Sequence, residues 1–204
     1  MKTCLIICSM LVVSCLFSQT DSIARDKKYR YGLQFGGSFN TLIGQPLINP
    51  IVTQSNDKHQ FEFGPKFYTG AWNPEGVRFG FEVNYKYYPN TKVTPFSSFL
   101  LLNSELYYEK GTVYYTDYNS IPNEVHQVTR TWTTQIAAIQ IGYGIEYRFL
   151  SQFYLTTDVS FGGYYQETDG ARISDEPLLN SEWSNGFFGL STRMGLSLGW
   201  RFKK

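Results

Sequence analysis

The chain has 204 residues, a formal net charge of +1, 18% aromatic side chains and a mean hydropathy of −0.28. A sequence with this charge balance shows no basic patch, so we expect no nucleic-acid partner. All three cysteines, Cys4, Cys8 and Cys15, stand near the start of the sequence. We therefore expect neither disulfides nor cysteine-based metal or catalytic sites in the rest of the chain.

The first residues have the layout of a secretory signal peptide. Lys2 precedes an apolar run from Leu5 to Val13, and small or polar residues follow that run. The run is about half of the roughly 20 apolar residues that a membrane-spanning helix needs, and no later segment is long and apolar enough to form one. We predict a signal peptide over residues 1–18, a short polar lead-in over residues 19–28 and one domain over residues 29–204. Without Lys2 the charges balance, since 17 − 17 = 0.

The sequence from Gly186 to Phe202 alternates between apolar residues and small or polar ones. A period of two is typical of a β-strand, because successive side chains point to opposite faces of a sheet. An ordinary strand has about 5 to 6 residues, whereas a tilted strand that crosses a bilayer needs roughly 9 to 11. The apolar face ends in Trp200 and Phe202. The pattern therefore indicates a membrane-spanning β-barrel, and the strand length argues against the alternative of a secreted, soluble β-sandwich.

Six earlier segments show the same alternation. Turn-forming residues such as Asn73-Pro74-Glu75-Gly76 and Leu150-Ser151-Gln152 join neighbouring segments, which indicates antiparallel hairpins. The six segments are Tyr29–Phe39, Phe61–Thr69, Val77–Tyr87, Phe96–Tyr108, Thr131–Phe149 and Phe153–Tyr165.

A bacterial barrel of one chain has an even number of strands, so one strand is still to be found. Thr41–Thr53 is one candidate, although its two prolines weaken the case. Thr112–Tyr118 is the other, but it is short and alternates poorly. We favour Thr41–Thr53, because Glu109–Arg130 then remains a long outer loop, like Gln166–Asn185, while short turns lie at the periplasmic end. The prediction is an all-β, eight-stranded, antiparallel up-and-down transmembrane β-barrel.

Three stretches carry a resemblance to a known family. They are Glu82–Asn90, the Gly142-Tyr143-Gly144 strand that leads into Arg148–Leu155, and the closing Leu198–Phe202. Together with the leader they resemble the small outer-membrane β-barrel domain family of Gram-negative bacteria, over nearly the whole mature chain. Lys203 and Lys204 depart from the pattern, because many of these barrels end on the aromatic residue.

The resemblance implies a place rather than a reaction, since the family is functionally mixed. It implies a multi-pass barrel in the bacterial outer membrane, surrounded by outer-membrane lipid and lipopolysaccharide and inserted by the barrel-insertion machinery.

A second cleavage site stands before Cys15, because Val12-Val13-Ser14-Cys15 fits a lipoprotein signal. We favour cleavage after Ser18, since a barrel holds itself in the bilayer and gains little from a lipid anchor.

The polar faces of the predicted strands bring many charged side chains into the barrel. Eight strands leave room only for side chains in the lumen, so we predict a network of ion pairs that plugs it. In the alternative, a narrow pore or transport accessory, Arg78, Glu82, Arg148 and Arg193 act as selectivity charges. The predicted lumen charges are Arg30, Glu62, Lys66, Arg78, Glu82, Lys86, Glu146, Arg148, Asp158, Arg193 and Arg201.

Aromatic residues gather in the two predicted outer loops. Tyrosine and tryptophan offer a large contact area at a low entropic cost, which suits a protein or glycan partner. The alternative is that they belong to the outer aromatic girdle. Acidic residues of the second loop match no calcium-loop spacing, so we predict no metal site. The candidate contacts are Tyr114, Tyr115, Tyr118 and Trp183.

The sequence offers little for catalysis. Its only histidines are His59 and His126. Some small barrels are lipid A-modifying hydrolases in which a histidine activates a hydroxyl nucleophile. No serine stands in register beside His126, and Thr129 or Ser120 would approach it only through loop folding. We predict a non-enzymatic structural or accessory envelope protein with no catalytic residue and no cofactor. A narrow pore is the first alternative and a lipid A-modifying hydrolase the second.

Overall fold

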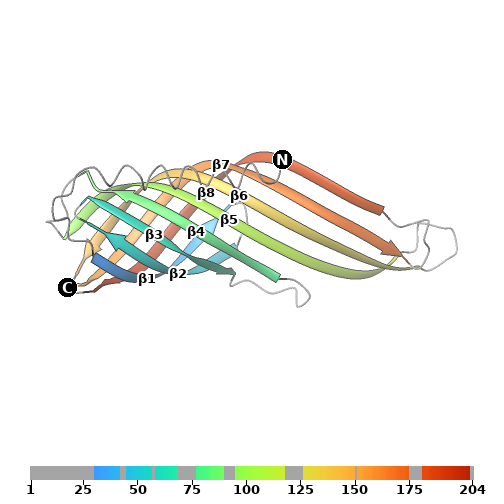
Figure 1. Cartoon of the computed structure of the whole chain (residues 1–204), viewed down its shortest axis with the longest axis horizontal. Helices are drawn as coiled ribbons and strands as arrows, with labels where there is room; N and C mark the ends of the chain where they lie inside the picture. Colours follow the sequence, from blue (N-terminus) through green and yellow to red (C-terminus); the bar gives the residue numbers. More distant parts are fainter. Residues whose placement is uncertain are drawn as a thin grey trace.

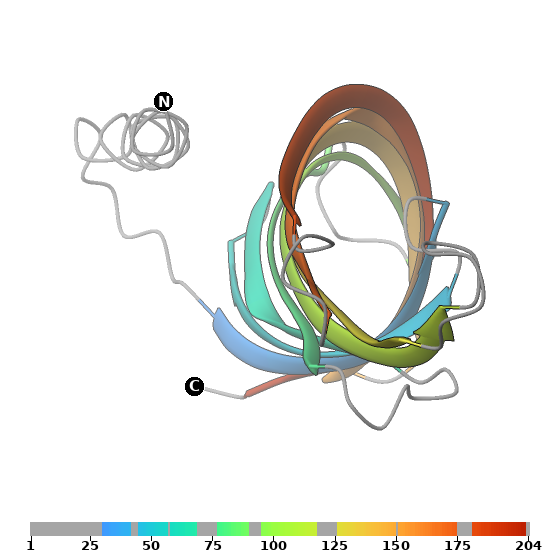
Figure 2. The same ribbon diagram turned by 90° about the vertical axis from the view of Figure 1, so that its right-hand side faces the viewer.

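The computed structural model describes residues 30–41, 45–56, 58–68, 77–89, 95–117, 126–149, 151–174 and 181–202. Each strand pairs antiparallel with its neighbours in sequence, and β1 also pairs with β8, so the sheet closes into a barrel (Figures 1 and 2). This confirms the all-β, eight-stranded, up-and-down prediction. The predicted leader and lead-in, residues 1–28, lie outside the described residues. The strands are β1 (Arg30–Asn40), β2 (Gln45–Ser55), β3 (His59–Tyr68), β4 (Val77–Tyr87), β5 (Phe96–Asp117), β6 (His126–Arg148), β7 (Phe153–Ser174) and β8 (Ser181–Arg201).

The alternation of the sequence corresponds to the inside and the outside of this barrel. On β1, Gln34 and Ser38 are buried in the lumen, whereas Leu33 and Phe35 are exposed on the outer surface. The same division holds along the barrel part of every strand, because side chains alternate between the two faces of a sheet. The barrel is therefore polar inside and apolar outside. Among the described residues there is no helix that is both long and apolar enough to cross a membrane.

The strand that the sequence analysis left to be found is β2. The favoured candidate, Thr41–Thr53, is confirmed, since β2 pairs with β1 from Gln45 to Ser55. The register between β2 and β3 places Pro50 opposite Pro65, and the ladder is interrupted between Ile48↔Phe67 and Val52↔Phe63. Because neither proline has an N–H to donate, the two share one gap in the ladder. The other candidate, around Thr112, belongs to β5.

The predicted bounds of the outer loops are wrong. Residues 109–117 and 126–130 belong to β5 and β6, and residues 166–174 and 181–185 belong to β7 and β8. Residues 118–125 and 175–180 lie outside the described part of the chain. The last four strands have 21 to 23 residues each, about twice the length of the first four. Beyond the ends of β1–β4 these strands continue as a four-stranded sheet (Figure 1). We call this sheet the extension; it consists of residues 110–117, 126–133, 169–174 and 181–184.

An apolar belt surrounds the barrel between the extension and the opposite end of the barrel. On β7 its exposed outward residues run from Phe153 to Phe161, and Tyr165 ends the belt. At about 3.3 Å per residue and a strand tilt of about 40°, these roughly 13 residues cover about 30 Å along the barrel axis. An aromatic row closes the belt at the end opposite the extension, the short-turn end. Its ring centroids lie 4.6 to 6.3 Å apart in the order Phe96, Tyr147, Phe149, Phe153, Trp200 and Phe202, with 5.0 Å between the last two.

Candidate functional site

The lumen holds two clusters of charged side chains, and the one nearer the extension centres on Arg193. Its guanidinium forms an ion pair with Asp158 and lies 3.2 Å from Glu105 and 3.5 Å from Glu82. Lys66 pairs with the same two glutamates, at 2.9 Å from Glu82. All five side chains are at most 5% exposed. We call this group the Arg193 cluster; its formal charge is 2 − 3 = −1.

Neutral side chains add hydrogen bonds to the Arg193 cluster. Asn40 donates to Glu105 at 2.7 Å, and Asn49 donates to Glu82 at 3.0 Å. The Tyr107 hydroxyl also donates to Glu105, at 2.6 Å. These donors come from β1, β2 and β5, so three strands of the barrel wall are hydrogen-bonded to the carboxylates of the cluster. Hydrogen bonds of this kind are needed to keep charges in a site from which water is excluded.

The second cluster lies at the short-turn end and centres on Glu146. Arg201 lies 2.6 Å and Arg148 2.9 Å from its carboxylate. Lys86 lies 2.6 Å from Glu62, which belongs to the same end of the lumen. We call this group the Glu146 cluster; its formal charge is 3 − 2 = +1. The two clusters together are neutral, because −1 + 1 = 0.

Uncharged groups join the two acids of the Glu146 cluster. Gln60 donates to Glu62 at 2.7 Å and accepts a bond of 3.0 Å from Arg201. Tyr88 donates to Glu146 at 2.7 Å. The guanidinium of Arg201 also lies 4.0 Å from the centre of the Tyr154 ring. This end of the lumen is therefore filled by side chains from β3, β4, β6, β7 and β8, together with Tyr88 just after β4.

An apolar layer lies between the Arg193 cluster and the extension. Its buried members are Leu47, Tyr68, Tyr107 and Ile136, and Tyr164 packs against them. Beyond the layer, Arg78 forms an ion pair with Glu109, and its guanidinium lies 4.8 Å from the centre of the Tyr68 ring. The lumen is thus closed toward the extension by apolar side chains and toward the short turns by the Glu146 cluster.

The structure gathers most of the predicted lumen charges but not all of them. Lys66, Glu82, Asp158 and Arg193 meet in one cluster, and Glu62, Lys86, Glu146, Arg148 and Arg201 meet in the other. Arg78 stands apart with Glu109 beyond the apolar layer. Arg30 shares the inward register of β1, but it is the first residue of the strand and its side chain is exposed at the short-turn end.

Sequence reasoning missed one central residue of the lumen. Glu105 is fully buried and contacts both Lys66 and Arg193. The alternation of the sequence does predict an inward position for Glu105, because the even-numbered residues of this strand, such as Leu106, were assigned to the outside. Tyr107 was missed for the same reason. Which acids Asn40 and Asn49 bond could not be predicted, since that depends on the pairing of distant strands.

The predicted loop contacts lie on strands of the extension. Tyr114 is 65% exposed on the outer face of β5, and Tyr115 is the next residue of that strand. Trp183 lies on β8, on the face that lines the lumen in the barrel part of that strand. Tyr118 lies outside the described residues. Tyr114 and Trp183, the two whose side chains the structure describes, therefore lie on opposite faces of the sheet.

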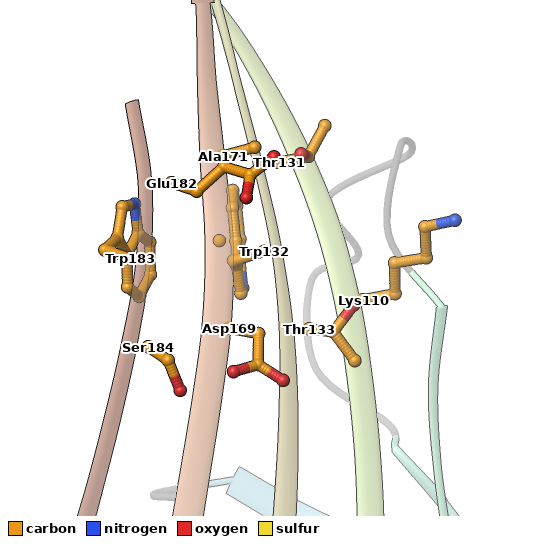
Figure 3. Close-up of a pocket in the computed structure, with 10 residues that line it drawn as sticks. Lys110, Thr131, Trp132, Thr133, Asp169, Ala171, Glu182, Trp183 and Ser184 are labelled. Atoms are coloured by element: carbon orange, nitrogen blue, oxygen red, sulfur yellow. The ribbon is translucent and has the colours of Figure 1, made fainter. Parts of the chain in front are cut away.

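The extension carries a shallow hollow of about 580 Å³ (Figure 3). Two rows across the sheet border it, and Trp132, Gly170 and Trp183 of the row between them line it as well. The two bordering rows are Lys110, Thr133, Asp169 and Ser184, and Thr131, Ala171 and Glu182. These residues alternate with Trp132 and Trp183 and so belong to the outer face. Whereas the outer face of the barrel is apolar, the outer face of the extension is mostly polar.

Comparisons with known proteins show the fold. No protein-family profile matches the sequence, and no curated protein matches it either. A major outer membrane protein from Thermus thermophilus superposes with a TM-score of 0.58 at 12% identity, over 86% of this chain and all of that one. The N-terminal β-barrel domain of Pseudomonas aeruginosa OprF reaches a TM-score of 0.49 at 13% identity, over 85% of this chain and 97% of the other. The chain thus shares the fold of a small outer-membrane β-barrel.

Proposed function

We propose that the protein is an integral outer-membrane β-barrel with a plugged lumen, which anchors the extension on the outer side of the membrane. In this role it is a non-enzymatic structural or accessory component of the cell envelope. The surrounding partners are outer-membrane lipid and lipopolysaccharide, and the insertion machinery handles the chain during assembly.

The membrane part of the proposal rests on the apolar belt. Its height of about 30 Å is close to the apolar band of roughly 25 Å that outer-membrane barrels present to lipid. The aromatic row at the short-turn end has the composition of an interfacial girdle, in which aromatic rings lie at the level of the lipid headgroups. The outer face becomes polar where β5–β8 pass beyond the belt, as water-exposed strands require. The start of β1, the end of β8 and the short turns then lie on the periplasmic side.

The plug is the single observation that carries the assignment of a scaffold. Two buried clusters of ion pairs, the apolar layer and a second apolar cluster of Tyr88, Phe99 and Leu101 occupy the lumen of the described residues. Water and ions would have to break several buried ion pairs to pass, and breaking one such pair costs about 3 to 5 kcal/mol. We therefore expect no ion conduction under ordinary conditions.

Conductance of single molecules in planar bilayers tests this proposal. We expect the refolded wild-type protein to be silent, because Glu82 and Arg193 face each other in the plug instead of lining a water path. Arg78→Ala should also be silent, since Arg78 lies beyond the apolar layer. Stable wild-type steps that change in size or selectivity with Arg78→Ala or Glu82→Ala would contradict the proposal and establish the pore instead. Heat-modifiable mobility in gels confirms that each sample is folded.

The lipid A-modifying hydrolase finds no support in the register of the extension. His126 begins β6 opposite Asp117, and Thr129 stands three positions further along the same strand, so the two positions belong to opposite faces. Ser120 lies outside the described residues. The other histidine, His59, bonds to the Tyr85 hydroxyl at 2.8 Å near the short-turn end, away from the extension.

A further inference from the structure

One edge of β8 is free beyond the end of β1. On its other side β8 pairs with β7 along nearly its whole length, from Trp200 to Ser181. The pairing with β1 ends where Asn40 stands opposite Arg193, whereas β8 continues to Ser181 (Figure 1). In the part of the chain that the structure describes, no strand covers this side of β8 over residues 181–191.

The hydrogen bonds at the end of β1 show which backbone groups point to this edge. The N–H group of Thr41 donates to the Thr192 carbonyl at 3.0 Å, and the N–H group of Thr192 donates to the Thr41 hydroxyl at 2.9 Å. Both backbone groups of Thr192 therefore point toward β1. Residues of a strand alternate between its two sides, and the register with β7 is continuous. The even-numbered residues of β8 beyond Thr192 thus direct their N–H and C=O groups to the free edge.

Most of this edge lies beyond the apolar belt. Phe188 stands opposite Tyr165, which ends the belt on β7. From Phe188 to Ser181 every residue of β8 is exposed except Trp183, which is half-buried. Proteins commonly protect a sheet edge from other strands with lysine, proline or a bulge. Residues 181–188 contain neither lysine nor proline, and their register with β7 has no bulge, so the edge is open to a further strand.

Apolar side chains flank the edge where it leaves the belt. Phe187 is 47% and Phe188 79% exposed, and they lie on opposite faces of β8. A tyrosine of β7 packs against each of them, with ring centroids 5.8 Å apart for Phe187 and Tyr164 and 4.7 Å apart for Phe188 and Tyr165. The sides of the two phenylalanines that face away from β7 suit β-branched or aromatic residues of an added strand, because such cross-strand pairs stabilise a sheet.

The other end of the edge carries a negative charge. Glu182 is exposed and is the only charged residue of the segment 181–188. Opposite charges that face each other across antiparallel strands stabilise the pairing, so lysine or arginine fits opposite Glu182. A strand that continues the ladder begun by β1 runs antiparallel to β8. Its first residues therefore pass Phe188 and its last residues pass Glu182.

We propose that this edge of β8 binds an extended segment of another protein as an added antiparallel strand. The segment has β-branched or aromatic residues opposite Phe187 and Phe188 and a basic residue opposite Glu182. Main-chain hydrogen bonds supply the affinity of such a complex, and the alternating side chains supply its specificity. Two copies in one membrane do not pair through their β8 edges, because an antiparallel pair would turn one barrel over. The inference rests on the proposed function in that the edge lies outside the bilayer.

Titration of fluorescent peptides into the refolded protein in lipid nanodiscs tests the inference. The probe is the capped peptide Val-Val-Thr-Thr-Thr-Thr-Lys, whose first residue passes Phe188 and whose last passes Glu182. One control is N-methylated at its third and fifth residues, whose N–H groups face β8, and the other at its fourth and sixth, whose N–H groups face away. We expect saturable binding of the probe, at least tenfold weaker binding of the first control, and binding of the second within threefold of the probe.

Two outcomes of this titration would overturn the proposal. Equal binding of the two methylated peptides would show that the probe does not bind as a strand. No binding of the unmodified probe would remove the inference as a whole.

Variants of β8 locate the binding edge. Ser184→Pro removes an N–H group that points to the free edge and keeps the hydrogen bonds to β7, so the sheet tolerates it. We expect it to weaken binding at least tenfold, and Ser184→Ala, which keeps that N–H group, to stay within twofold of wild type. Glu182→Lys should weaken binding about threefold and restore it for a peptide that ends in glutamate. Equal binding by Ser184→Pro and Ser184→Ala would overturn the assignment to this edge.

Sedimentation of the protein in detergent detects a second copy as the occupant of the edge. We expect a monomer. A dimer that Ser184→Pro abolishes would overturn the proposed partner, because another copy of the chain would then cover the edge. Neither measurement depends on conduction. A silent barrel that binds no peptide therefore leaves the plugged scaffold intact, and a conducting barrel that binds the peptide contradicts only the plug.

Discussion

Arg193 is the residue whose surroundings best explain why the lumen is closed. It lies between three carboxylates, Glu82, Glu105 and Asp158, and Lys66 is the only other cation of that cluster. The group is favourable only as a whole, because charges removed from water depend on their partners. Without the guanidinium, three acids would surround one ammonium group.

We expect Arg193→Met to lower the free energy of unfolding by about 3 to 5 kcal/mol, the usual effect of stranding buried charges. Urea unfolding of the refolded protein in lipid vesicles measures this change. Arg30→Met is the matched control, since Arg30 is exposed at the start of β1, and it should change the free energy by less than about 0.5 kcal/mol. An Arg193→Met variant as stable as the control would show that the cluster does not hold the lumen together.

Alternation in the sequence predicts which charged residues lie on the inner faces, but it does not predict which of them form ion pairs. Lys66, Glu82 and Arg193 all follow from the period of two, because each strand has one apolar face. Which of them meet depends on the register between β3, β4 and β8, and no sequence pattern fixes that register. The exposed position of Arg30 follows from the strand end rather than from its face.

At the scale of the strands, the prediction succeeded inside the belt and failed beyond it. Val77–Tyr87 was predicted with the bounds that β4 has. The segments 109–117 and 126–130 were assigned to a loop although they are strands. Alternation arises where an apolar outer face lies opposite a polar lumen. In the extension both faces meet polar surroundings, so the contrast disappears while the backbone pairing continues.

A proline in the extension tests that these segments are strands. Thr131 lies in β6, which pairs on both sides with Thr112 of β5 and Ala171 of β7. Thr131→Pro removes an N–H from a central strand, so we expect proteases to cut the extension while the barrel remains intact and heat-modifiable. Limited proteolysis with mass spectrometry locates the cuts.

Thr131→Ala is the control for this experiment, because it removes the side chain and keeps the N–H group. It should resist proteolysis as the wild-type extension does. If Thr131→Pro were equally resistant, the N–H group of residue 131 would not be part of a strand ladder and the extended strands would be wrong.

At the scale of the whole molecule, three zones follow one another along the barrel axis. The short-turn end carries the aromatic row, the belt encloses the plugged lumen, and the extension continues with a polar outer face. The charge clusters cancel each other, since the Arg193 cluster has −1 and the Glu146 cluster has +1. A neutral plug of this kind suits a scaffold that holds its extension in a fixed position above the membrane.

The order of these zones relative to the membrane is the central claim. A chain cut after Ser18 retains no cysteine, so single cysteines introduced into it report their positions without background. We choose Ser184→Cys on the outer face of the extension, Ile141→Cys in the belt and Lys58→Cys in the turn between β2 and β3.

Labelling of intact Gram-negative cells with a membrane-impermeant maleimide is the most direct measurement. We predict that Ser184→Cys reacts on intact cells, that Lys58→Cys reacts only after the outer membrane is permeabilised, and that Ile141→Cys stays unlabelled in both states. Labelling of Lys58→Cys on intact cells with protection of Ser184→Cys would invert the barrel. Labelling of Ile141→Cys would contradict the membrane belt itself.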